Sequence, residues 1–258
     1  MKIERVLANN PGPFTGPGTN TWLLDDGSGN LVVIDPGPIE SDHRKAIEGS
    51  VGSRHVVAVL VTHTHSDHAP MANPLAVDLE VPALGHAPGP NFDPDDCLDE
   101  GDELAVGSLA LSVVATPGHA WDHLCFRVGD VLFSGDHIIG GSSVMVEDMG
   151  PYLASLEKLR GTGLRHICPG HGEEIDEPDQ VIDWYMAHRR QRHEEILEAI
   201  ARGAGTVGEI VEVVYADVDP DLHALAARSV QAHLSLMIAE GQIAFDRERA
   251  SVLPPPTP

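Results

Sequence analysis

The chain has 258 residues, of which 42% are hydrophobic, and its 40 acidic and 16 basic residues give a formal net charge of -24 at pH 7. This length and apolar content can bury a sizeable core, and we expect one large domain with a small appendage. The negative charge disfavours proteins that bind nucleic acids through phosphate contacts, because those contacts draw on Lys and Arg. No apolar run reaches the roughly 18 residues of a membrane-spanning helix.

Short apolar runs predict the first strands. Strands are expected at residues 3–7, 21–24, 31–35 and 55–61, with a helix at about 41–48. Asp35 ends the third of these strands, before Pro36-Gly37. Its carboxylate can accept a proton from a metal-ligating imidazole and fix the tautomer of that ring. The alternative is a simple turn aspartate.

The densest group of metal-capable side chains follows the fourth strand, in Thr62-His63-Thr64-His65-Ser66-Asp67-His68. His63 and His65 are two positions apart, so on extended backbone they point the same way. Asp67 and His68 come where a helix over about 67–75 is expected to begin, and they can face a neighbouring point. Two adjacent metal ions, one for each pair, account for this pattern. A solvated His-rich turn is the alternative.

Three further candidate ligands follow later strands, each in a tight turn marked by Gly or Pro. His119 comes after a strand at 110–115, Asp136 after one at 131–133, and His171 after one at 166–168. Strand ends can meet at one edge of a sheet, so these residues can complete the metal set. Each of them alone would be interpreted as a surface turn residue. His123, four residues after His119, is a candidate for contacting a metal ligand.

Strands and helices alternate over the first part of the chain, with another strand at 124–128 and a helix at about 152–159. This order predicts an α+β protein built from two packed sheets with helices outside them. The three cysteines, an odd and sparse number, suit a reducing compartment, and residues 1–5 lack the apolar run of a secretory signal. We therefore predict a cytoplasmic protein. Cys168 is expected to be a buried structural thiol.

From about residue 180 the pattern becomes helical, with a long amphipathic segment, a second helix from Thr206, a third at 222–240 and a strand at 243–245. Three helices and a short hairpin predict a winged-helix-like region over 179–258, which follows a catalytic domain over 1–178. The candidate recognition helix, 222–240, carries a single arginine, Arg228. We therefore expect this region to cover a pocket or to form a homodimer contact, and not to bind DNA. The proline-rich tail, 254–258, is expected to be disordered.

The metal-capable residues resemble the pattern of the metallo-β-lactamase superfamily, whose members share a four-layer αββα sandwich with a zinc site at one edge. The resemblance implies one Zn²⁺ on His63, His65 and His119. It implies a second on Asp67, His68 and His171, with Asp136 bridging the two ions. Iron or manganese can occupy such a set as well. An aspartate at position 136 resembles the glyoxalase II, ribonuclease Z and thioesterase branches.

Other segments resemble the β-lactamase-like protein 2 family over nearly the whole chain. They are the opening at 10–21, Tyr152-x-x-Ser155-Leu156-x-x-Leu159, and Tyr185-x-x-His188-Arg189-x-x-Arg192. Two departures stand out, and both concern the shape of the pocket. Pro70 and Met71 stand where relatives usually carry glycine, and the segment between 143 and 152 is short.

The resemblance implies a dinuclear zinc-dependent hydrolase in which a metal-bridging hydroxide attacks a thioester, an ester or a similar small substrate. Asp136 holds the ions and Asp67 orients the nucleophile. Asn20 is a candidate for steadying an oxyanion, with a structural turn as the alternative. His188 and Arg189, within a basic island that includes Arg190 and Arg192, are candidates for gripping a small anionic substrate.

Several functions stay open beside this one. They are a single-strand endoribonuclease, a β-lactam or lactone hydrolase, and a nucleic-acid-binding regulator that is not an enzyme. The expected partner is a small-molecule or carrier-borne acyl substrate. RNA is disfavoured by the net charge, and no membrane partner is expected.

Overall fold

A computed structural model describes residues 1–246 and 249–253. The chain divides into two compact units. The sandwich unit comprises Met1–Pro117, Asp122–Val144 and Gly161–Asp179, and the helical unit comprises Gly118–Trp121, Met145–Arg160 and Gln180–Pro258. The expected disorder of the tail at 254–258 lies outside the described residues. No helix in the described part of the chain combines the length and the apolarity that crossing a membrane requires.

The first sheet of the sandwich unit has six strands, in the order β1 (Lys2–Leu7), β2 (Asn20–Asp25), β3 (Asn30–Ile34), β4 (His55–Leu60), β5 (Ala83–Gly85) and β6 (Asp96–Cys97). The first three strands pair antiparallel, and β3 to β6 pair parallel. β2 is buried along its whole length, as expected for a strand that is covered on both faces.

The second sheet lies face to face with the first and has five strands. Its order is β11 (His166–Pro169), β10 (Val131–Gly135), β9 (Leu124–Val128), β8 (Leu109–Ala115) and β7 (Glu103–Val106). Only β10 and β11 are parallel. Apolar side chains from both sheets form one core, in which the rings of Trp22 and Phe133 meet edge to face with centroids 6.2 Å apart. The predicted pair of packed sheets is confirmed.

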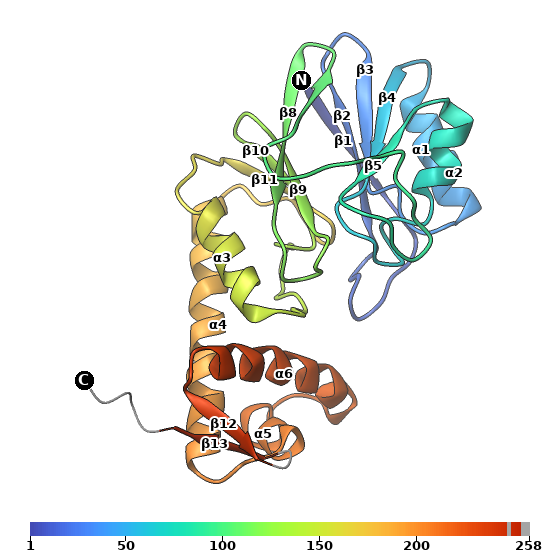
Figure 1. The fold of residues 1–258 in the computed structure, drawn as a ribbon. Coiled ribbons are helices and arrows are strands. Elements are labelled where there is room, and N and C mark those ends of the chain that lie inside the picture. Colours follow the sequence, from blue (N-terminus) through green and yellow to red (C-terminus); the bar gives the residue numbers. More distant parts are fainter. Residues whose placement is uncertain (247–248, 254–258) are drawn as a thin grey trace. The chain divides into compact units, whose positions relative to one another are not determined.

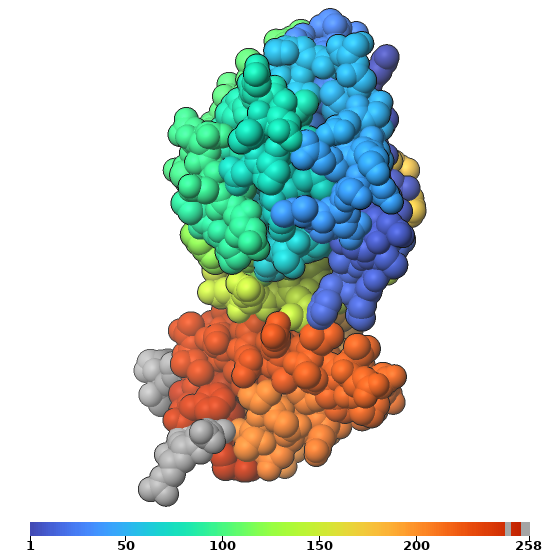
Figure 2. All heavy atoms as spheres, turned by 90° about the vertical axis from the view of Figure 1, so that its right-hand side faces the viewer, coloured from blue at the N-terminus to red at the C-terminus, as the bar shows by residue number. Residues whose placement is uncertain are grey.

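Two helices, α1 (Ser41–Val51) and α2 (Ala72–Leu79), cover the outer face of the first sheet (Figure 1). Ile47 and Leu75 are buried in a second apolar cluster together with Leu23 and Val33 of the sheet. Figure 2 shows this helical face of the unit from outside. The helix expected over 67–75 begins only at Ala72. The reason is Pro70, which disfavours helical backbone at the residue before it.

The helical unit contains α3 (Met149–Leu159), α4 (Pro178–Ala201, which begins in the sandwich unit), α5 (Val207–Val214), a 3₁₀ turn at Pro220–Leu222, and α6 (His223–Ala239). An antiparallel hairpin of β12 (Ile243–Asp246) and β13 (Arg249–Val252) follows α6. Residues of α4, α5, α6 and the hairpin share an apolar core that includes Ile210, Val230 and Met237. The predicted three helices and hairpin are confirmed (Figure 1).

Candidate metal centre

The candidate ligands of the sandwich unit stand just beyond the ends of neighbouring strands. His63 follows β4, Asp136 follows β10 and His171 follows β11. The turn before Asp136 needs a glycine, because Gly135 has a positive φ of 46° and a Cβ there would lie 2.5 Å from Thr62 Oγ1. Gly170 is constrained by space alone, since its added Cβ would lie 2.5 Å from Asp136 Oδ1. Both glycines let backbone approach the ligands closely.

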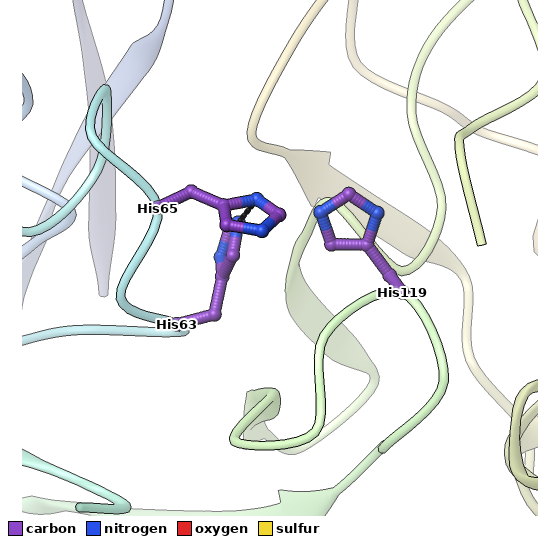
Figure 3. A group of neighbouring side chains, drawn as sticks. All are labelled: His63, His65 and His119. Carbon is purple, nitrogen blue, oxygen red and sulfur yellow. Dashed lines mark hydrogen bonds between the residues drawn. The ribbon is translucent and has the colours of Figure 1, made fainter. Parts of the chain in front are cut away.

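One group of candidate ligands consists of three histidines. His63, His65 and His119 each place one ring nitrogen within 4.8 Å of the others, and their rings face one another (Figure 3). His63 Nε2 and His65 Nδ1 are only 2.9 Å apart. Two ring nitrogens that face the same point can share a proton or a cation. His119 Nδ1 lies 2.7 Å from the carbonyl of Met145, a contact that helps to fix the orientation of the ring.

A second group comprises Asp67, His68 and His171, again with one ligand atom each within 4.8 Å. Asp67 Oδ2 lies 3.3 Å from His68 Nε2 and 3.2 Å from His171 Nε2. The two imidazole Nε2 atoms are themselves 3.4 Å apart. These atoms converge on one point, as ligands of a single ion would.

Asp136 contacts two histidines of the second group and lies near His63 of the first. Its Oδ2 lies 3.2 Å from His171 Nε2 and its Oδ1 lies 3.5 Å from His68 Nε2. Together with His63 and His68 it forms a further set of ligand atoms within 4.8 Å of one another. Its carboxylate therefore lies near ligand atoms of both groups, and a bridging role for it stays a prediction.

Acceptors behind the histidines fix which ring nitrogen faces the centre. His68 Nδ1 donates to Asp35 Oδ2 at 2.9 Å, and His171 Nδ1 donates to the Gly18 carbonyl at 3.1 Å. Asp35 also accepts from the backbone N–H and the hydroxyl of Thr62, at 2.8 and 2.7 Å. It lies in the left-handed region, with φ 50°, a conformation that costs free energy in a non-glycine residue. This arrangement presents Nε2 of both rings to the carboxylates, as in carboxylate–histidine–metal sites.

His123 supports the turn that carries Asp136. The backbone N–H of Asp136 donates to His123 Nε2 at 3.1 Å, so Nδ1 carries the proton in the neutral ring and donates to Thr116 Oγ1 at 2.8 Å. This histidine therefore contacts the backbone of a candidate ligand, and its part in the site stays a prediction.

Asn20 does not present a free donor to the centre. Its amide nitrogen donates to the carbonyls of Pro169 and Gly172, at 2.9 Å each. These bonds clamp the loop that carries His171, which favours the structural alternative for Asn20. Sequence reasoning missed Thr19, whose hydroxyl donates to Asp67 Oδ2 at 2.9 Å. No local pattern marks Thr19, because only the fold brings it close to Asp67, 48 positions away.

The expected basic island does not form one exposed surface. Within the helical unit, Arg189 is 3% exposed and its guanidinium lies 5.4 Å from the centroid of the Tyr152 ring. His188 stacks on Trp184, and burial, with Arg189 and Arg192 nearby, lowers its pKa. Arg192 pairs with Glu195 at 2.7 Å. The two candidates His188 and Arg189 therefore belong to the packing of α4.

Electrostatics make the centre receptive to cations. Burial by itself lowers the pKa of His171, yet the carboxylates of Asp136 and Asp67 outweigh it and raise that pKa to about 9. Burial by itself raises the pKa of Asp136, yet His68 and His171 hold it well below its usual range. The same balance lowers the pKa of Asp67 and raises that of His68. Imidazoles and carboxylates at these distances are a donor set that fits divalent metal ions.

Comparisons with known proteins agree with this geometry. Residues 14–76 and 70–171 match the metallo-beta-lactamase superfamily, and residues 206–250 match the beta-lactamase associated winged helix domain. A beta-lactamase-like protein 2 homolog of Drosophila melanogaster is 32% identical and aligns over 93% of this chain and 89% of its own. An atrochrysone carboxyl ACP thioesterase of Aspergillus chevalieri is 30% identical, over 95% and 83%.

A solved structure shares the fold. The beta-lactamase domain protein from Burkholderia ambifaria superposes with a TM-score of 0.83 at 23% identity, and the match covers 97% of this chain and 91% of that one. The expected metallo-β-lactamase fold with a winged helix is thereby confirmed. The chain belongs to the metallo-β-lactamase superfamily of hydrolases and, within it, to the β-lactamase-like protein 2 family.

Proposed function

We propose that this chain is a dinuclear zinc-dependent hydrolase that cleaves a thioester, an ester or a similar small acyl substrate. One observation carries the proposal. Nitrogen and carboxylate donors gather around neighbouring points that share Asp136, and the Nε2 atoms of His68 and His171 are aimed there by Asp35 and Gly18. Oriented imidazoles and carboxylates of this kind are a donor set that suits divalent metal ions.

When bound, divalent cations at such a site polarise a substrate carbonyl and make a water molecule nucleophilic near neutral pH. The residues of the chain position the reaction. Asp136 contacts His68 and His171 and has a ligand atom within 4.8 Å of one of His63, so it can link the two groups. Asp67 is held by the Thr19 hydroxyl, and its lowered pKa keeps it as a carboxylate that can accept a hydrogen bond from a water molecule and orient it. His123 and Gly135 fix the turn from which Asp136 projects.

Two observations favour an acyl substrate. The relative from Aspergillus chevalieri, similar over 95% of this chain, is named a thioesterase that acts on a carrier protein. The net charge of -24 repels polyanions such as RNA, for which binding depends on neutralised phosphates. A small-molecule or carrier-borne acyl thioester is therefore the proposed substrate class. A cytoplasmic location is part of the proposal, and the three free cysteines support it.

The test compares four substrates with the zinc-loaded full-length protein. They are an acyl-pantetheine thioester, a lactone, a β-lactam and a labelled single-stranded RNA, measured side by side with the zinc content per chain. We expect thiol release from the thioester to be the fastest reaction, and chelation to abolish it. His63→Ala is expected to remove the same activity, whereas Asp130→Asn, at an exposed aspartate before β10, keeps it.

Two results would overturn the proposal. One is RNA cleavage that depends on His63 without any thioester turnover. The other is a chain that binds zinc in these groups and hydrolyses none of the four substrates.

A further inference from the structure

A group of metal-ligating side chains lies on β11, apart from the candidate metal centre. His166, Cys168 and Glu174 each offer one ligand atom, and these atoms lie within 4.8 Å of one another. The same 4.8 Å criterion also identifies the three groups of the candidate metal centre among the described residues. Unlike them, this group includes a thiol.

The backbone places these side chains on one face. Ile167 and Ile175 form an antiparallel bridge, with reciprocal N–H to carbonyl bonds of 2.9 and 3.0 Å. The residues on either side of each isoleucine point to the opposite face from it. His166 therefore stands opposite Asp176, and Cys168 stands opposite Glu174. All four side chains share the face on which Cys168 enters the core between the sheets.

His166 is held as metal-ligating histidines are held. Its Nδ1 lies 2.9 Å from Asp176 Oδ1, and its Nε2 lies 2.6 Å from Glu174 Oε2. A carboxylate on one ring nitrogen orients the ring and makes the other nitrogen a better ligand. His68 in the candidate metal centre has the same arrangement, with Asp35 in the place of Asp176.

The Cys168 thiol gives a second, independent sign of a ligand. It is fully buried, its sulfur lies within 4.8 Å of the His166 and Glu174 ligand atoms, and among the described contacts it has no hydrogen-bond partner. The other buried thiol, Cys125, differs in this respect. Its sulfur lies 3.2 Å from Thr116 Oγ1 and 3.6 Å from the Ser134 carbonyl. These contacts account for the Cys125 thiol, whereas the Cys168 sulfur lies near two groups that can bind a metal ion.

We propose that Cys168 Sγ, His166 Nε2 and Glu174 Oε2 bind a Zn²⁺ ion, with Asp176 orienting the imidazole. Thiolate, imidazole and carboxylate together are ligands that zinc accepts, while a thiolate disfavours Mg²⁺ and Ca²⁺. The side chains of His166 and Glu174 are 25% and 44% exposed, so an ion can enter from solvent and keep one position for water. On binding, the sulfur–zinc bond forms and the thiol proton passes to solvent. The ion ties the start of β11 to the returning segment 174–176.

The experiment titrates the metal-free, full-length protein with Co²⁺ and records the near-ultraviolet sulfur-to-cobalt charge-transfer band. The candidate metal centre has only nitrogen and oxygen donors, so this band reports a thiolate ligand alone. Cys97→Ser serves as the background, because Cys97 is an exposed thiol. We expect a band in this background that Cys168→Ser abolishes. A titration without the band, or a band that persists in Cys168→Ser, overturns the proposal.

Further variants leave the buried thiol in place, so their effect on the band cannot come from the loss of Cys168 packing. His166→Gln and Glu174→Gln are each expected to weaken Co²⁺ binding at the band by more than about tenfold, and Asp176→Asn by about tenfold. Glu173→Gln, at the adjacent exposed acid, is the matched control and leaves the band unchanged. Asp136→Ala keeps the band even though it damages the proposed catalytic site, so the two proposals fail separately. Unchanged affinity in both His166→Gln and Glu174→Gln contradicts the site.

Discussion

Two regions of the molecule bury different kinds of side chain. One is formed by the loops at the strand ends of the sandwich unit, and the other is the core of the winged helix domain. In the loops, polar groups are buried together, and each is held by a defined neighbour, as Asp35 holds both Thr62 and His68. In the winged helix domain, the cluster that contains Ile210 and Val230 is apolar, with His233 as a buried polar neighbour, and the ion pair of Glu209 with Arg249 stays exposed. The comparison teaches that a metal site depends on the orientation of its polar side chains. The stability of the winged helix domain depends instead on a filled apolar core and on capped helices.

The largest effect is expected from Asp136→Ala, because this residue contacts His68 and His171 and also has a ligand atom within 4.8 Å of one of His63. Loss of a direct ligand should exceed the roughly 10- to 100-fold cost of losing an outer partner. We expect hydrolysis to fall by more than about 100-fold. The measurement is kcat/KM with zinc content per chain, and Asp130→Asn is the control. Near-normal turnover in Asp136→Ala would remove the distinction between the two regions.

Ile210→Ala tests the other side of the comparison. Ile210 is fully buried in the winged helix core, and its truncation should cost about 2–5 kcal/mol of the free energy of unfolding. Val213→Ala on the same helix removes a side chain that is 57% exposed, and should stay within about 0.5 kcal/mol. Urea unfolding measures both. Zinc content is expected to stay at the wild-type value, and a drop in Ile210→Ala would show that the core also orients the ligands.

Asp35→Asn isolates orientation from ligation. The amide keeps the shape of the side chain but weakens its acceptance of the His68 Nδ1 proton. We expect zinc affinity to fall by about 10- to 100-fold, measured by competition with a chelator. Asp42→Asn, at an exposed aspartate of α1, should leave the affinity unchanged. An equal loss in both variants would point to net charge as the cause.

Thr206→Ala is expected to have a smaller effect, on stability alone. The Thr206 side chain accepts from the Glu209 backbone N–H, and the Glu209 side chain accepts from the Thr206 backbone N–H, which forms a capping box at the start of α5. Loss of the cap should cost about 1 kcal/mol of the free energy of unfolding. Thr206→Ser keeps the hydroxyl and should restore most of it. The measurement compares the denaturant midpoints of the wild type, Thr206→Ala and Thr206→Ser.

The smallest effect is expected on the stability of the protein at acid pH. Hydrogen bonds from Arg249, Thr206 and Gly205 lower the pKa of Glu209 from 4.5 to about 2. Because the folded-state pKa is lowered, this contribution is present above pH 4.5 and is lost as the pH falls towards 2. Glu209→Gln should therefore flatten the pH dependence of unfolding within that window. A profile that matches the wild type would show that solvent screens the interaction completely.

Sequence reasoning located the candidate ligands because their spacing reflects strand geometry. His63 and His65 alternate by two, and His119, Asp136 and His171 each follow an apolar run, which a local pattern can express. It did not predict β5 and β6, which have three and two residues and are too short for periodicity to register, or β7, which begins at the end of an acidic stretch. Contacts such as Thr19 with Asp67 depend on residues 48 positions apart, and no local pattern encodes them. The division at residues 178 and 179 stays a prediction.

The bridge between Ile167 and Ile175 sets the length of the segment that it encloses. Insertion or deletion of one residue between them would shift the register by one and turn Glu174 and Asp176 to the opposite face. The same change would move His171 relative to the Gly18 carbonyl that holds its ring. Length variation among homologues should therefore be rare between positions 168 and 174, even where the identities of the exposed residues drift.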